Sequence, residues 1–148
     1  MPLPVTAVYA ALLTLWILYL AARTGMARRA QGVWLGDGGN ERVLHESRAH
    51  GNAVETVPLT LVLMALAEGV GTPPIALHPL GLALLAARVL HGLYFFTGAK
   101  SVALRAAGAG GTMLVQLALA AGLLGHVLAG TASAAVALGV QIPAWSIA

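Results

Sequence analysis

Three side chains with different chemistry lie on one face of a predicted helix. Arg48, Asn52 and Glu55 are spaced i, i+4 and i+7, and a helix brings residues at these spacings close together. They belong to the polar half of the stretch 42–67, whose apolar run of about 11 residues is half of the ~20 that a membrane-spanning helix needs. If this stretch crosses a bilayer, its polar half supplies the missing turns. Ionisable groups at that depth are costly and usually functional.

The next apolar segment carries two further candidates at a similar depth. Counted at 1.5 Å per residue from the loop that joins the two segments, Glu55 lies about 20 Å deep, His91 about 18 Å and Arg88 about 14 Å. A buried arginine needs a partner, and Glu55 is the carboxylate at matching depth. The sequence therefore predicts a Glu55–Arg88 ion pair with His91 beside it. Two interpretations stay open: a purely structural pair with a satisfied histidine, and part of a binding site.

Arg105 opens the last long apolar segment. A ligand anion at this position would meet a guanidinium and a helix N-terminus, and both favour negative charge. A thiol held there would have a lowered pKa. The chain has no cysteine, so any thiol would come with a substrate. The alternative interpretation of Arg105 is a charge that only orients the protein in the membrane.

The composition predicts that these residues sit in an integral membrane protein. Of the 148 residues, 59% are hydrophobic and only 9% are charged, whereas a soluble domain carries about 25% charged residues. The formal net charge is +3, but the basic residues are few and scattered, which favours a topology signal over nucleic-acid binding.

The chain is expected to form a single all-α domain over residues 1–148, a bundle of four transmembrane helices. Uncharged or apolar stretches and Gly/Pro breaks place these helices at about residues 4–22, 41–68, 79–97 and 102–130. Residues 24–40 form a Gly-rich loop with Asn40 as N-cap of the second helix. Small residues from Ala106 to Thr112 should let the fourth helix approach a neighbour closely. The apolar tail 131–148 is interpreted as an interfacial segment or a helix extension.

The basic residues predict the orientation of the bundle. The amino terminus, the second loop and the tail have no basic residue. The basic residues that gather around the first and third loops are Arg23, Arg28, Arg29, Arg42, Arg48, Lys100 and Arg105. By the positive-inside rule both termini lie on the non-cytoplasmic side. No metal site is predicted, since His45 and His50 are spaced i, i+5 rather than i, i+4. The glycines after Gly36 lack the Lys-Ser/Thr pair of a phosphate loop.

Three motifs in order resemble one family. The run 48–58 is similar to the second-helix signature of the MAPEG superfamily, the membrane-associated proteins in eicosanoid and glutathione metabolism. In that signature an arginine is followed by a histidine or glutamine two residues later, an asparagine four residues later, a glutamate seven residues later and then a proline. The run 88–91 resembles the third-helix pattern, and 105–108 the start of the fourth helix. The pattern is closer to the bacterial, YecN-like branch than to the eukaryotic enzymes. Those enzymes often have tyrosines where this chain has Phe95 and the pair Thr56 and Val57.

This resemblance implies a homotrimer in a bacterial inner membrane, with glutathione bound between neighbouring subunits. Arg48 would bind a glutathione carboxylate, Asn52 a polar backbone group, and Glu55 the amine or Arg88. His91 would line the site, and Arg105 would stabilise the thiolate. Tyr94 is expected on a different face from Phe95.

The function predicted first is therefore conjugation of glutathione to a lipophilic electrophile, as in a microsomal-type glutathione transferase, with no metal and with membrane lipid as the source of the electrophile. The second hypothesis is a non-catalytic protein of the same fold that binds glutathione or lipid. The third is a small proton-coupled multidrug transporter, whose glutamate would be expected in the first helix, where this chain has no charge.

Overall fold

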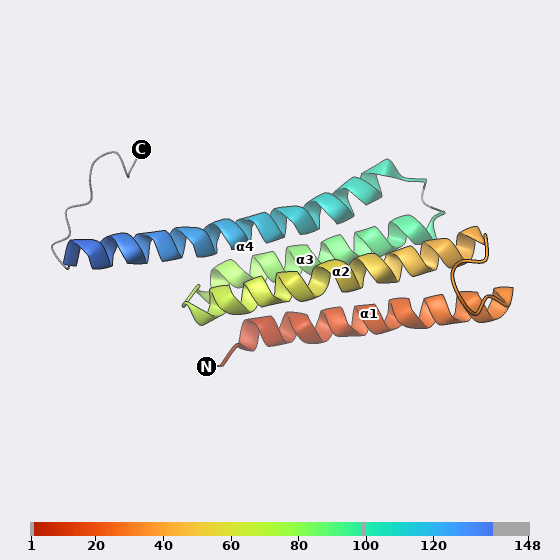
Figure 1. Ribbon diagram of the computed structural model, residues 1–148, viewed down its shortest axis with the longest axis horizontal. Helices are drawn as coiled ribbons and strands as arrows, with labels where there is room; N and C mark the ends of the chain where they lie inside the picture. Colours follow the sequence, from red (N-terminus) through yellow and green to blue (C-terminus); the bar gives the residue numbers. More distant parts are fainter. Residues whose placement is uncertain (1, 99, 138–148) are drawn as a thin grey trace.

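The computed structural model describes residues 2–98 and 100–137, and these form an antiparallel bundle of four helices (Figure 1). The helices are α1 (Pro4–Gln31), α2 (Glu41–Gly69), α3 (Pro74–Phe96) and α4 (Val102–Ala137). The N-terminus and the α2–α3 turn lie at one end of the bundle, and the other two connections lie at the opposite end. α4 packs on α3 and α2 and runs on past the ends of the other helices.

Three of the described helices, α1, α3 and α4, are long and apolar enough to cross a membrane. The remaining helix, α2, is also long enough: its 29 residues span about 44 Å. It is less apolar because its first half carries the polar residues of the run 41–55. The prediction of an all-helical membrane bundle is therefore confirmed, with α2 as its polar member.

The first helix is longer than the sequence indicated. α1 continues past residue 22 to Gln31, through the segment that was expected to be loop. Thr24 fits the helix because its Oγ1 donates to the Leu20 carbonyl. The helix ends at Gly32, which adopts the left-handed conformation at φ 66° and donates its N–H to helix carbonyls, an arrangement that glycine makes at little cost.

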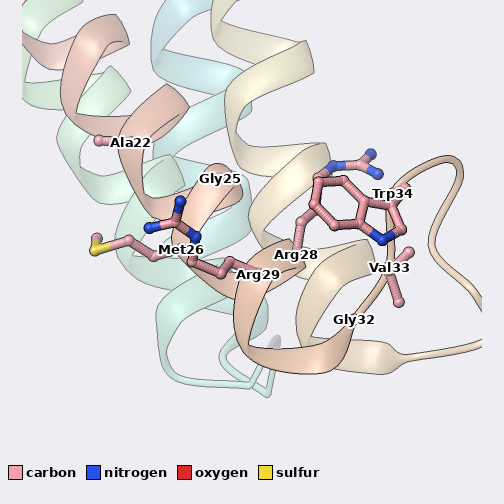
Figure 2. A pocket seen from close by; sticks show the side chains of 8 residues that line it. All are labelled: Ala22, Gly25, Met26, Arg28, Arg29, Gly32, Val33 and Trp34. Atoms are coloured by element: carbon pink, nitrogen blue, oxygen red, sulfur yellow. The ribbon is translucent and has the colours of Figure 1, made fainter.

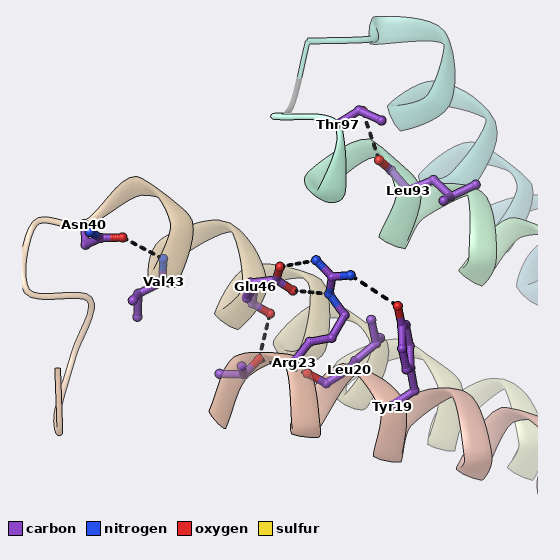
Figure 3. Close-up of polar contacts among 9 residues, drawn as sticks. Tyr19, Leu20, Arg23, Asn40, Val43, Glu46, Leu93 and Thr97 are labelled. Carbon is purple, nitrogen blue, oxygen red and sulfur yellow. Dashed lines mark hydrogen bonds and ion pairs between the residues drawn. The ribbon is translucent and has the colours of Figure 1, made fainter. Parts of the chain in front are cut away.

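The other helix ends follow the caps and prolines. The Asn40 side chain accepts a 3.1 Å hydrogen bond from the Val43 N–H, so the predicted N-cap is confirmed (Figure 3). α3 starts at Pro74 rather than at the predicted Pro79, because a proline suits the first helical position and Pro79 is accommodated further in. α4 continues to Ala137, which makes residues 131–137 a helix extension. The rest of the predicted tail, 138–148, lies outside the described residues.

Glycines set the distances between the helices. A Cβ added at Gly81 of α3 would stand 2.3 Å from the Tyr9 ring of α1, and one at Gly108 of α4 would stand 2.6 Å from the His91 Cα of α3. The predicted close approach of the small-residue run 106–112 is thus confirmed at Gly108. The main apolar core lies between all four helices, with Leu13, Leu77 and Leu84 fully buried in it.

Candidate functional site

A pocket of about 310 Å³ opens between α2, α3 and α4. Four of the five residues predicted to bind glutathione or its thiolate line it, together with two aromatic side chains and a small residue: Arg48, Asn52, His91, Arg105, Tyr94, Phe95 and Ala109. Residues from three helices, separated in the sequence by up to 61 positions from Arg48 to Ala109, therefore meet at one cavity. Tyr94 and Phe95 line the same pocket, so the expectation that Tyr94 faces elsewhere is wrong.

Two arginines stand at the mouth of this pocket. The side chains of Arg48 and Arg105 are both exposed. The one ion pair between side chains in the described part of the chain joins Arg23 and Glu46, so neither Arg48 nor Arg105 is neutralised there. Arg105 lies in the first turn of α4, where Ser101 accepts a 3.3 Å hydrogen bond from the Leu104 N–H. Two guanidinium groups and a helix N-terminus make the mouth electropositive.

His91 forms the inner wall. It is 7% exposed, and its ring packs edge-on against Phe95 with 5.3 Å between the ring centroids. The Gly108 backbone of α4 fits against His91, and this contact brings the start of α4 close enough to α3 to complete the pocket. The rigid packing fixes one imidazole in the pocket wall.

Arg88 lies beneath the pocket and is 2% exposed. Its Nη1 donates to Asn52 Oδ1 at 2.7 Å and to Thr56 Oγ1 at 3.0 Å, and its Nη2 donates to the Gly108 carbonyl at 2.7 Å. A guanidinium can only donate, so the Asn52 side chain must turn its carbonyl oxygen toward Arg88. The Asn52 amide NH₂ is then the group left to donate into the pocket.

The predicted Glu55–Arg88 ion pair does not form within the described chain. Glu55 is exposed on the outside of α2, although its depth in the bundle matches that of Arg88. The reason is the rotation of α2: Asn52 and Thr56 turn toward α3, and Glu55 lies about 60° from Asn52 on the side away from Thr56. The face that Glu55 shares with Asn52 therefore points only partly toward α3. Glu55 also does not line the pocket. Arg88 lies level with Asn52 and Thr56 of α2, but its partners are neutral oxygens instead of a carboxylate. Its depth is greater than predicted, because α3 starts five residues before Pro79.

A second polar contact was missed altogether. Arg23 of α1, interpreted from sequence as a topology charge, donates from Nε and Nη2 to the two carboxylate oxygens of Glu46 on α2 (Figure 3). Its guanidinium carbon lies 3.7 Å from the centroid of the Phe96 ring on α3, a cation–π contact. Glu46 is 5% exposed. The available signal was the scarcity of acidic residues, because Glu46 is one of only five in the chain and Arg23 is the first of three arginines in α1.

The bundle and its pocket define a small helical membrane protein with a candidate ligand site between three of its helices. The model of the MAPEG family matches residues 6–125, so the chain belongs to the MAPEG family and the resemblance seen in the sequence is confirmed. The matched stretch contains every residue that lines the pocket.

Two curated relatives carry the name inner membrane protein YecN, one from Escherichia coli strain K12 and one from strain CFT073. Each is 37% identical to this chain over 87 residues, which are 59% of this chain and 66% of the relative. The chain thus spans just under two thirds of the length of these relatives. Their name agrees with the membrane-length helices and with the predicted bacterial branch.

Proposed function

We propose that this chain binds glutathione in the pocket between α2, α3 and α4 and conjugates it to a lipophilic electrophile. The observation that carries the proposal is the gathering of Arg48, Asn52, His91 and Arg105 around one cavity of about 310 Å³. Glutathione has two carboxylates, an amine and a thiol. Two exposed guanidinium groups and an amide suit its carboxylates and peptide groups, and the volume falls at the lower end of the ~300–1,000 Å³ common for small-molecule sites.

In the proposed complex five of the residues that line the pocket bind the tripeptide or its sulfur. Arg48 binds a carboxylate, and the Asn52 NH₂, oriented by Arg88, donates to a peptide carbonyl. His91 and Phe95 form the wall against which the tripeptide packs. Arg105 and the first turn of α4 hold the sulfur as a thiolate, because positive charge stabilises the anion relative to the neutral thiol.

The proposed reaction is a nucleophilic substitution or addition. The thiol gives its proton to water, and the thiolate forms a bond from sulfur to an electrophilic carbon. In a substitution, a leaving group departs with the electron pair of the bond that breaks. In an addition, the electron pair of the broken π bond takes a proton from water. The long apolar faces of α1, α3 and α4 suit an electrophile that arrives from the surrounding lipid. Each of these steps proceeds through the pocket side chains and the bound thiol, without a metal ion.

We further propose a homotrimer that holds the site at the boundary between subunits. Glu55 supports this assembly, because an exposed carboxylate on a helix of a membrane bundle needs a polar partner. A neighbouring copy or the glutathione amine would supply one. The proposal also includes a bacterial inner membrane with both termini on the non-cytoplasmic side, as the arginines of the first and third loops favour.

A glutathione titration on the detergent-purified protein tests the proposal. Saturable binding is expected, together with an ultraviolet thiolate signal near neutral pH and turnover of chlorodinitrobenzene. Arg105→Ala should lower the thiolate signal and the turnover by about tenfold or more, as the loss of a charge-stabilising group does. Arg42→Ala, which removes an exposed arginine outside the pocket, is the matched control. No glutathione binding by the unaltered chain would remove the proposed function and leave the fold standing.

One observation favours a second candidate, a protein that binds glutathione or lipid without turnover. Phe95, which has no hydroxyl, occupies the position in the pocket wall where the similar enzymes often have a tyrosine, so a donor to the sulfur is missing at this position although Tyr94 lies beside it. Saturable glutathione binding with no thiolate signal and no turnover of chlorodinitrobenzene would select this candidate over the transferase.

A further inference from the structure

A second cavity, of about 510 Å³, lies where the last turns of α1 pass into the first loop (Figure 2). Ala22, Gly25, Met26 and Arg29 recur at i, i+3, i+4 and i+7 and so form one strip along the end of α1. Trp34, on the segment that leaves the helix, flanks the strip. None of these residues belongs to the proposed glutathione pocket.

The cavity combines two cations with an apolar groove. Arg28 and Arg29 both line it, and no carboxylate within residues 2–98 and 100–137 pairs with either of them. The polar contact that Arg28 makes is a 3.5 Å hydrogen bond to Ser47 Oγ. Gly25 leaves the groove open, since a Cβ built there would meet nothing within 4 Å. The cavity therefore contains two guanidinium groups without a carboxylate partner in the described chain and, next to them, an apolar groove.

The position of the cavity along α1 corresponds to the level of the bilayer surface. The 28 residues of α1 span about 42 Å, and a hydrocarbon core of about 30 Å that starts at Pro4 ends near Arg23. Arg28, Arg29 and Trp34 then stand at the level of the lipid headgroups, while Ala22 lies at the level of the acyl chains. Trp34 is 93% exposed in the chain, and tryptophan is enriched at membrane–water interfaces.

We propose that this cavity binds one anionic phospholipid. Figure 2 shows the Arg29 guanidinium on the Met26 side of the cavity and the Arg28 guanidinium beside Trp34. The phosphate therefore lies against Arg29, whose guanidinium matches phosphate geometry, and Arg28 adds positive charge from the other side. An acyl chain lies in the groove over Gly25 and against Met26, and the Trp34 indole covers the glycerol region. The shape fits a lipid better than a free anion, because a phosphate alone would leave the apolar strip uncovered.

The experiment measures lipid binding by native mass spectrometry on the detergent-purified protein. Phosphatidylglycerol and phosphatidylcholine are titrated separately, and inorganic phosphate is followed by equilibrium dialysis. Phosphatidylglycerol should bind more tightly than phosphatidylcholine, and phosphate should bind far more weakly than either. The Arg28→Gln/Arg29→Gln variant should weaken phosphatidylglycerol binding by about fivefold for each arginine removed. Arg42→Gln, an exposed arginine outside the cavity, should leave it unchanged.

A second variant keeps both charges and fills the groove. Gly25→Leu has room in the fold and should weaken phosphatidylglycerol binding without changing the response to phosphate. Equal affinity for phosphatidylglycerol and phosphatidylcholine would overturn the proposal. So would a loss of phosphatidylglycerol affinity in Arg42→Gln as large as in the double variant, because it would indicate a diffuse surface charge instead of a site. Phosphate binding as tight as phosphatidylglycerol binding, unaffected by Gly25→Leu, would identify a free-anion site instead. A parallel loss of glutathione affinity in the double variant would assign both arginines to the glutathione site.

Discussion

Arg88 Nη1 donates a 2.7 Å hydrogen bond to Asn52 Oδ1, and this bond connects the buried centre of the bundle to the pocket. Arg88 is 2% exposed, and its Nε has no partner in the described chain. The buried charge of the guanidinium is therefore stabilised only by hydrogen bonds to a few neutral oxygens of α2 and α4 in the described chain. In return it fixes the orientation of the Asn52 amide and the distance from α3 to Gly108. The same contacts that stabilise the fold thus shape the candidate site.

The first prediction concerns the partner of Arg88. Asn52→Leu removes an acceptor from a buried charge and should lower stability by about 1.5–3 kcal/mol, the range for hydrogen bonds to charged groups. In subunits separated in detergent, where no neighbouring copy can pair with Glu55, Glu55→Gln should change stability by less than about 0.5 kcal/mol, because Glu55 is exposed and bonds to nothing in the described chain. Thermal unfolding in detergent without glutathione measures both. A larger loss in Glu55→Gln than in Asn52→Leu would restore the ion pair that the sequence suggested.

The second prediction concerns the contact that joins α1 to α2. Arg23→Met leaves the Glu46 carboxylate buried without its cation and should cost about 3 kcal/mol, as breaking a buried pair does. Arg42→Met removes an exposed arginine near the same end of the bundle and is the control. The midpoint of unfolding in detergent measures the difference. Equal midpoints would mean that the Arg23–Glu46 pair contributes nothing to stability.

The sequence predicted the fold and most of the pocket because their signals are local. Helical spacing aligned Arg48 with Asn52, and the depth count brought His91 and Arg88 to about the level of Glu55 on the same helix as this pair. The error over Glu55 arose because depth fixes the position along a helix axis but leaves the rotation of α2 against α3 undetermined. That rotation is set by packing, such as the fit of Gly108 against His91. The Arg23–Glu46 pair was missed for the same reason.

The third prediction concerns the start of α1. The Glu68 carboxylate at the end of α2 accepts 2.8 Å hydrogen bonds from the N–H groups of Val5 and Thr6, so a residue 63 positions away caps this helix. Glu68→Ala should cost about 1 kcal/mol and open the first turn, since it removes a capping acceptor and a charge that complements the helix dipole. Hydrogen exchange over residues 3–8 should become faster. Glu41→Ala, which alters an exposed residue at the start of α2, should leave that exchange unchanged.

The fourth prediction separates packing from helix propensity at the start of α4. Gly108→Ala places a methyl group 2.6 Å from the His91 Cα, a distance that real Cβ atoms do not reach, so α3 and α4 must move apart. Gly110→Ala meets nothing within 4 Å. It should be neutral or stabilise by about 0.5–1 kcal/mol, the usual gain when alanine replaces a glycine inside a helix.

The two α4 variants should also differ in the site. Separation of α3 from α4 lengthens the bond from Arg88 to the Gly108 carbonyl and moves Arg105 away from His91, so Gly108→Ala should lower the melting temperature and the glutathione affinity together. Gly110→Ala should keep both. Because the substitution is the same in each variant, helix propensity cancels, and the remaining difference measures the contact with His91. Similar melting temperatures and affinities for the two variants would show that α3 and α4 are not held at this distance.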